Sequence, residues 1–121
     1  MPKKLTRTFG CPSEFTLEVL GGKWKTVILC YLRRQPLRFT DLRRLIPTLS
    51  DKVLTERLAD LSARGLVTRK RIGGPERQRD VYMLTPMGKT LTAPLTELYR
   101  WGEKHAVAFG VTVTNPLARL E

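Results

Sequence analysis

The chain has few of the residues from which most enzymatic and metal-binding sites are built. It contains two cysteines and one histidine in 121 residues, too few for a disulfide framework or a tetrahedral zinc site. It also has no glycine-rich phosphate-binding loop and no nucleophile with an evident neighbouring base. We therefore expect neither an enzyme nor a resident metal or cofactor.

Long apolar runs are also missing. No run reaches the roughly 18 residues that a membrane-spanning helix requires. The basic residues at the start of the chain are not followed by the apolar stretch of a signal peptide. The length, with 41% hydrophobic residues, indicates one globular domain over 1–121. We expect a cytoplasmic protein with no membrane partner.

Acidic residues are scarce relative to basic ones. Lys and Arg total 22 against 11 Asp and Glu, which gives a net charge of +11. Residues 33–79 hold thirteen of the bases and five of the acids, an excess of +8, whereas residues 80–121 are neutral overall. This imbalance favours a polyanionic partner, with nucleic acid as the first candidate and an anionic membrane surface as the second.

Two helices are predicted in the first third of the chain, after a loose basic arm over 1–10. Pro12 suits the first position of a helix over 12–20, which ends at a pair of glycines. A second helix over 23–34 carries a broad apolar stripe and is expected to be central.

A helix-turn-helix is predicted over 40–64. Residues 37–39 are expected to be extended, and Thr40 to cap a short helix that ends at a proline. Ser50 is expected to cap the longer second helix, whose apolar residues recur at helical spacing. Two helices joined by so short a turn have the spacing of a DNA-binding motif.

A hairpin and further helices are predicted after this motif. Strands over 66–72 and 80–84 flank a turn with two glycines, a proline and charged residues, so 66–84 is expected to form a wing. Helical spacing resumes over 86–106, and Pro94 is expected to kink this region or divide it in two. The chain is therefore predicted to be mainly α with a small β-hairpin, a winged helix-turn-helix.

The predicted fold supplies candidate contacts to double-stranded DNA. The second helix of such a motif enters the major groove, where the candidate residues are Ser50, Asp51, Lys52, Thr55 and Arg57. The candidate contacts to the DNA backbone, from the first helix and the wing, are Arg38, Thr40, Arg43, Arg44, Arg69, Arg71, Arg77 and Arg79. The alternatives are a solvated helix surface and wing bases that protect an edge strand.

Several stretches, in order, resemble the HxlR family of bacterial transcription regulators, which are winged-helix proteins related in shape to the MarR group. The matching stretches are Cys11-Pro12-Ser13-Glu14, Gly21-Gly22-Lys23-Trp24-Lys25, 38–47, Leu54-Thr55 with Leu58, Gly65-Leu66-Val67, 82–85 and Trp101-Gly102. The resemblance implies a homodimer that binds a palindromic operator, usually as a repressor, in the nucleoid of a bacterium. It also implies a dimer interface of N- and C-terminal helices.

The apolar residues of these outer helices have two interpretations. They extend the core of the protomer, or they face a partner, as a reader of a two-fold symmetric site requires. We favour the partner for Phe15, Leu17, Leu91, Leu95, Leu98, Trp101 and Phe109.

Cys11 is a candidate sensor of oxidants, aldehydes or quinones. The resemblance implies this role, because family members often sense such compounds through the cysteine of the Cys-Pro motif. A thiol at a helix N-terminus also has a lowered pKa. The alternative is a helix-start residue without a sensing role. Cys30 lies in an apolar stripe and is expected to be an inert core thiol.

Two other functions compete with a sequence-specific regulator. A small basic chain also suits a non-specific nucleoid-like protein or an RNA-binding protein without an effector. A regulator is expected to prefer one palindrome by about 10³-fold or more over random duplex.

Overall fold

The predicted helix-turn-helix is present in the computed structural model, which describes residues 7–114. Helix α3 spans Phe39–Leu45 and α4 spans Asp51–Ala63. The Ser50 hydroxyl oxygen accepts a hydrogen bond from the Val53 N–H at 3.1 Å, which confirms Ser50 as the cap of α4. Gly65 follows α4 with a φ of +77°, the left-handed conformation in which helices commonly end.

The start of α3 corrects two expectations. Thr40 is not the cap, because it lies inside the first turn and Arg38 precedes the helix. The Asp41 carboxylate accepts the Arg38 N–H at 2.9 Å, so this backbone donor is satisfied without a hydroxyl at position 40. Phe39 is helical rather than extended, and within the predicted segment it is Leu37 that forms a β-bridge.

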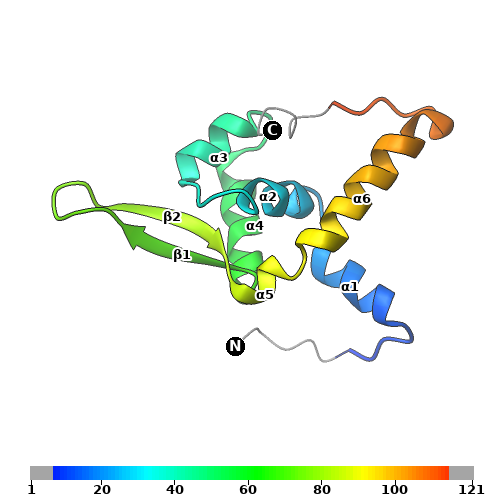
Figure 1. The fold of residues 1–121 in the computed structure, drawn as a ribbon, viewed down its shortest axis with the longest axis horizontal. Coiled ribbons are helices and arrows are strands. Elements are labelled where there is room, and N and C mark those ends of the chain that lie inside the picture. Colours follow the sequence, from blue (N-terminus) through cyan, green and yellow to red (C-terminus); the bar gives the residue numbers. More distant parts are fainter. Residues whose placement is uncertain (1–6, 115–121) are drawn as a thin grey trace.

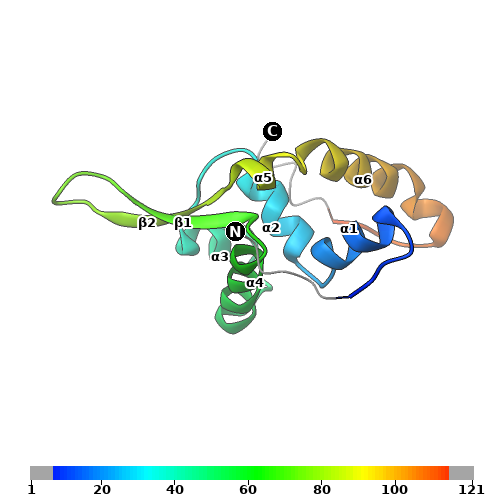
Figure 2. The same cartoon turned by 90° about the horizontal axis from the view of Figure 1, so that it is seen from below.

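The wing is an antiparallel hairpin of β1 (Val67–Ile72) and β2 (Arg79–Leu84). Val67 lies opposite Leu84 at its base, where both are buried, whereas the turn at 73–78 is exposed. Figures 1 and 2 show the hairpin projecting away from the helices. The two predicted strands are confirmed, each to within one residue.

Helices α1 (Pro12–Leu20) and α2 (Lys25–Leu32) follow one another across a short turn. Pro12 occupies the first position of α1, as predicted. Helix α2 begins two residues later than predicted, because Trp24 has a φ of +83° and so cannot belong to a right-handed helix. Of the predicted basic arm, residues 1–6 lie outside the described residues.

The core is formed mainly by α2, α3 and α4, which confirms α2 as the central helix. Its largest fully buried side chains are Tyr31, Ile28, Leu29, Leu42, Leu54, Leu58 and Leu61. Each buried leucine or isoleucine contributes roughly 2 kcal/mol of hydrophobic free energy. The helix-turn-helix is therefore anchored on α2.

The C-terminal region is divided into two helices, as predicted. Helix α5 spans Pro86–Lys89 and α6 spans Thr92–His105, followed by the 3₁₀ helix η1, Ala106–Phe109. The break precedes Pro94, which lies in the first turn of α6, where its missing N–H costs no helical hydrogen bond. Figure 1 shows α1 and α6 on the side away from the wing. Within residues 7–114, no helix is long and apolar enough to cross a membrane.

Gly88 allows α5 to pack closely against the start of the wing. A Cβ atom at Gly88 would lie 2.1 Å from the Leu66 carbonyl oxygen, far inside van der Waals contact. Thr85 fixes this approach, because its hydroxyl donates to the Gly65 carbonyl oxygen at 2.6 Å and accepts the Gly88 N–H at 3.0 Å. The position of α5 therefore requires glycine at residue 88.

We expect Gly88→Ala to lower the free energy of unfolding by about 2 kcal/mol, because the added methyl group forces α5 away from Leu66. Urea unfolding followed by circular dichroism measures this change. Gly102→Ala is the matched control, since a Cβ at position 102 meets nothing within 4 Å. The higher helix propensity of alanine is expected to raise the free energy of unfolding by about 0.5–1 kcal/mol. Equal effects of the two substitutions would contradict the packing argument.

Candidate nucleic-acid interface

The two sides of α4 differ in exposure, as the sequence predicts. Leu54, Leu58 and Leu61 are at most 2% exposed. The opposite side, near the start of the helix, is exposed to solvent through Ser50, Asp51, Lys52, Thr55 and Glu56. Helix α4 thus presents the polar surface that a recognition helix needs in the major groove.

Two contacts fasten α4 to the start of α2 and to the turn that precedes it. Lys25 is buried, and its ammonium forms an ion pair with Asp60 of α4. The Arg57 Nε donates to the Lys23 carbonyl oxygen at 2.9 Å. Arg57, a candidate residue of the recognition helix, therefore uses one of its donors within the protomer.

The pair with Lys25 keeps Asp60 ionised. Burial alone raises the pKa of this carboxyl group, but the hydrogen bond and charge of Lys25, helped by Arg64, lower it below its usual value. Lys25 in turn depends on Asp60, because a buried ammonium without a counter-ion is costly. Local spacing does not predict this pair, since the two residues lie on different helices.

Arg43 closes the turn of the helix-turn-helix. Its guanidinium donates to the Leu49 carbonyl oxygen and forms an ion pair with Asp51, the first residue of α4. Leu49 lies in the turn and Asp51 lies just beyond it, so Arg43 links α3 to both the turn and the start of α4. The sequence predicts a clamp on the DNA backbone, whereas the structure shows Arg43 engaged within the protomer.

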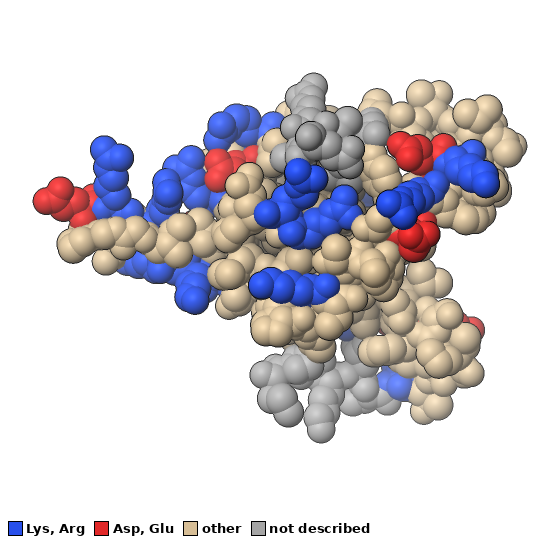
Figure 3. All heavy atoms as spheres, in the orientation of Figure 1, with Lys and Arg blue, Asp and Glu red and all other residues tan. Residues whose placement is uncertain are grey.

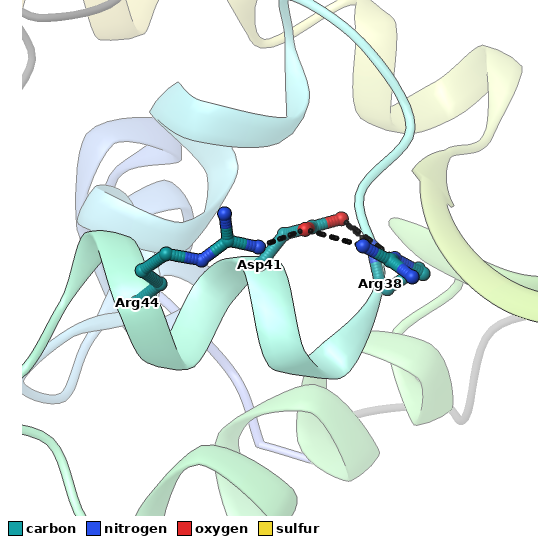
Figure 4. Close-up of polar contacts among 3 residues, drawn as sticks. All are labelled: Arg38, Asp41 and Arg44. Atoms are coloured by element: carbon teal, nitrogen blue, oxygen red, sulfur yellow. Dashed lines mark hydrogen bonds and ion pairs between the residues drawn. The ribbon is translucent and has the colours of Figure 1, made fainter.

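Asp41 holds two of the predicted phosphate contacts. One oxygen accepts the Nη2 groups of Arg38 at 3.3 Å and Arg44 at 2.8 Å, and the other accepts the Arg38 Nε at 3.3 Å. Figure 4 shows the carboxylate between the two guanidinium groups. The hydrogen bond from Arg38, more than the charge of Arg44, lowers the pKa of Asp41 despite its partial burial. Asp41 is not among the residues predicted for the site, although its spacing of three residues from each arginine signals such pairs.

The wing carries exposed bases along its length. They are Arg69, Lys70, Arg71, Arg77 and Arg79. Arg71 faces Asp80 across the hairpin at 3.2 Å and also donates to the Gln78 side chain at 3.3 Å. In the described part of the chain, no ion pair involves Arg69, Arg77 or Arg79. Figure 3 shows basic side chains over the wing and α3, and Thr40 of α3 is also exposed.

The two thiols are in opposite environments. Cys11 is exposed and precedes α1, where hydrogen bonds from the backbone N–H and hydroxyl of Ser13, and then from the Glu14 N–H, lower its pKa. Cys30 is buried, and burial raises its pKa although Arg33 opposes the shift. Cys11 is therefore the thiol that forms a thiolate more readily near neutral pH.

Residues 7–9 contact α1 rather than forming a loose arm. Arg7 forms an ion pair with Glu18 at 3.2 Å, and its guanidinium lies 5.0 Å from the centre of the Phe9 ring. Phe9 meets Phe15 edge to face, with ring centres 5.8 Å apart. The part of the arm that the structure describes is thus folded back along α1, the helix that Cys11 precedes.

Five of the seven predicted dimer residues are exposed, and two are not. Phe15, Leu17, Leu98, Trp101 and Phe109 are 45–70% exposed. Leu95 is 2% exposed within the core of its own protomer, so its predicted place facing a partner is corrected. Leu91 also packs against this core. The sequence analysis missed three further exposed residues after α6, namely Val107, Val111 and Val113.

His105 lies on the same apolar surface. Its ring lies against that of Trp101, with centres 4.6 Å apart and the ring planes tilted by 38°. Across residues 7–114, no group of three His, Cys, Asp or Glu side chains is placed to hold a metal ion.

Comparison with known sequences identifies similar proteins along most of the chain. The family model described as "HxlR-like helix-turn-helix" matches residues 19–108. The HTH-type transcriptional regulator YkvN of Bacillus subtilis, itself uncharacterised, is 39% identical over 100 residues, which cover 83% of this chain and 84% of that protein. These matches span the helix-turn-helix and the wing.

Solved structures show the same fold in redox-related regulators. The reduced form of the redox regulator HypR superposes with a TM-score of 0.72 at 35% identity, covering 78% of this chain and 93% of that one. The quinone-bound form of YodB from B. subtilis superposes with a TM-score of 0.65 at 32% identity, covering 78% and 99%. The winged-helix architecture is thereby confirmed.

We expect Asp60→Asn to lower the free energy of unfolding by about 1–2 kcal/mol at neutral pH, because it leaves the buried Lys25 without a counter-ion. The pKa of Asp60 is lowered in the folded state, so its contribution is present above the pKa of the unfolded chain, near 4, and is lost as pH falls through the folded pKa. Urea unfolding at a series of pH values measures it.

The difference between wild type and Asp60→Asn is therefore expected to shrink below pH ~4. Glu97→Gln is the control, because Glu97 pairs with Arg100 on the exposed surface of α6 and its loss is expected to leave stability unchanged. A difference that stays constant from neutral to acidic pH would rule out the proposed linkage.

Proposed function

Because the chain belongs to the HxlR-like helix-turn-helix family of transcription regulators, we propose that it binds a palindromic DNA operator as a homodimer and represses transcription. We further propose that an oxidant, aldehyde or quinone releases it from DNA by reacting with Cys11. The observation that carries the first proposal is the exposed polar side of α4 beside a basic wing. Such a regulator acts in the cytoplasm, on the nucleoid.

The DNA surface has two parts. Lys52 and Thr55 extend from α4 toward base edges, where Lys suits guanine and Thr suits a phosphate or a thymine methyl group. The residues that bind phosphates, and so set the affinity rather than the sequence preference, are Arg38, Arg44 and the wing bases other than Arg71. Arg43 and Arg71 have partners within the protomer and so shape this surface.

The homodimer is supported by the exposed apolar residues of α1, α6 and η1. Leu98, Trp101 and Phe109 leave at least half of their surface in water in the single chain. An apolar surface of this kind is typical of an interface. A second copy placed there provides the second recognition helix that a palindromic site requires.

The sensing proposal combines the position of Cys11 with the relatives. HypR is a redox regulator, and YodB has been solved with quinone bound. At Cys11 the thiolate sulfur would form a bond to a carbon of a quinone ring C=C bond. The π electrons of that C=C bond would shift onto the conjugated carbonyl oxygen, which takes up a proton. The added group stands at the start of α1, so it changes the element that we place at the dimer interface.

Selection from a pool of random duplexes tests the DNA proposal. We expect the purified protein to enrich one sequence with two-fold symmetry and to bind it about 10³-fold more tightly than random duplex. Six to eight phosphate contacts predict a slope of log affinity against log salt of roughly −5 to −7. Equal binding of all duplexes would instead establish the non-specific nucleic-acid-binding alternative, and an asymmetric motif would exclude the palindrome.

Alkylation tests the sensing proposal on the selected duplex. We expect a quinone to weaken binding by wild type at least tenfold and to leave binding by Cys11→Ser unchanged, because Cys30 is buried and has a raised pKa. Mass spectrometry of the treated protein gives the number and position of the adducts. If both proteins respond alike, Cys11 is not the sensor, and the DNA-binding proposal stands.

A further inference from the structure

The cluster of Arg38, Asp41 and Arg44 lies where the wing meets α3. Arg38 follows Leu37, whose N–H and carbonyl both bond to Tyr82 of β2, so it stands at the junction of the hairpin and the helix-turn-helix. The Arg38 and Arg44 side chains are 44% and 72% exposed, whereas Asp41 is 22% exposed. The two bases thus cover the acid.

The presence of Asp41 on this surface is unexpected if the affinity for DNA depends only on net charge. A carboxylate repels phosphate, so its removal from a DNA-binding surface is expected to tighten binding. Both oxygens of Asp41 are instead occupied by N–H groups of Arg38 and Arg44. A guanidinium has five N–H donors, so each arginine keeps most of its donors for another anion.

We propose that Asp41 is a positioning residue for DNA binding, which orients Arg38 and Arg44 toward the phosphates of a DNA strand that lies over the junction of α3 and the wing. A long side chain loses rotamer freedom when it binds, and a partner that already restricts it reduces this cost. The inference rests on the proposed DNA-binding function and adds the residue that sets the geometry of the backbone contact.

The direction in which Asp41→Asn changes the affinity for DNA distinguishes a positioning role from a simple effect of net charge. Asn at position 41 keeps an oxygen for the Arg38 N–H but loses the charge that holds both guanidinium groups. We expect Asp41→Asn to weaken binding of the selected duplex about fivefold. The matched control is Glu56→Gln, which removes one negative charge from the exposed side of α4, where the described residues contain no ion pair to Glu56. It is expected to tighten binding about twofold.

A second background shows whether Asp41 acts through the two arginines. The double variant Arg38→Gln/Arg44→Gln lacks both guanidinium groups that Asp41 would orient. In this background Asp41→Asn only removes a negative charge, so it is expected to tighten binding about as much as Glu56→Gln does. Fluorescence anisotropy at fixed salt measures all affinities, and circular dichroism verifies folding. Tighter binding by the single variant Asp41→Asn, or weaker binding on adding it to the double variant, would overturn the inference.

Arg44→Gln keeps the test decisive if Asp41→Asn does not fold. Arg44 is exposed and takes no part in the start of α3, so this variant is expected to fold. The inference requires weaker binding and a salt slope smaller by about one, and an unchanged slope would overturn it. A wild-type protein that selects no duplex refutes the proposed function itself, whereas tightening by Asp41→Asn refutes only the positioning role.

Discussion

The arrangement of the whole DNA-facing surface depends on how the apolar side of α4 is buried. Leu54, Leu58 and Leu61 are held in the core, which leaves the polar side of the helix facing water. Leucine packing fixes which side is buried, and the ion pair between Lys25 and Asp60 joins α4 to α2 in addition. A rotation of α4 would expose leucine and separate a buried ammonium from its partner, so the two interactions oppose the same movement.

The positive charge of the surface is organised by a smaller number of acids. Asp41, Asp51 and Asp80 each pair with at least one arginine of α3 or the wing, and these acids decide the direction in which the guanidinium groups point. Individually, exposed pairs of this type contribute little to stability. Their role is better understood as reducing the number of conformations that long basic side chains explore before they meet DNA.

Most elements of the fold follow from local sequence features, whereas several site contacts do not. Ser50, Pro12 and the glycines and proline of the wing turn predict their elements because capping, fixed φ and turn propensity act over a few residues. The left-handed Trp24 and the link from Arg43 to Asp51 depend on how helices meet, which local spacing does not encode. Leu95 was assigned to the wrong side because helical spacing identifies an apolar stripe without showing which part of it the protomer itself covers.

The wing is attached only at its base as far as residues 7–114 show, through Val67, Leu84 and the bridge between Leu37 and Tyr82. The turn at 73–78 has no contact with the helical body that would fix its distance from the core. Adding or deleting one residue on each strand beside this turn would therefore change the reach of the hairpin and leave the base in register. The span of the hairpin is thus independent of the packing of the interior, and the two can be altered separately.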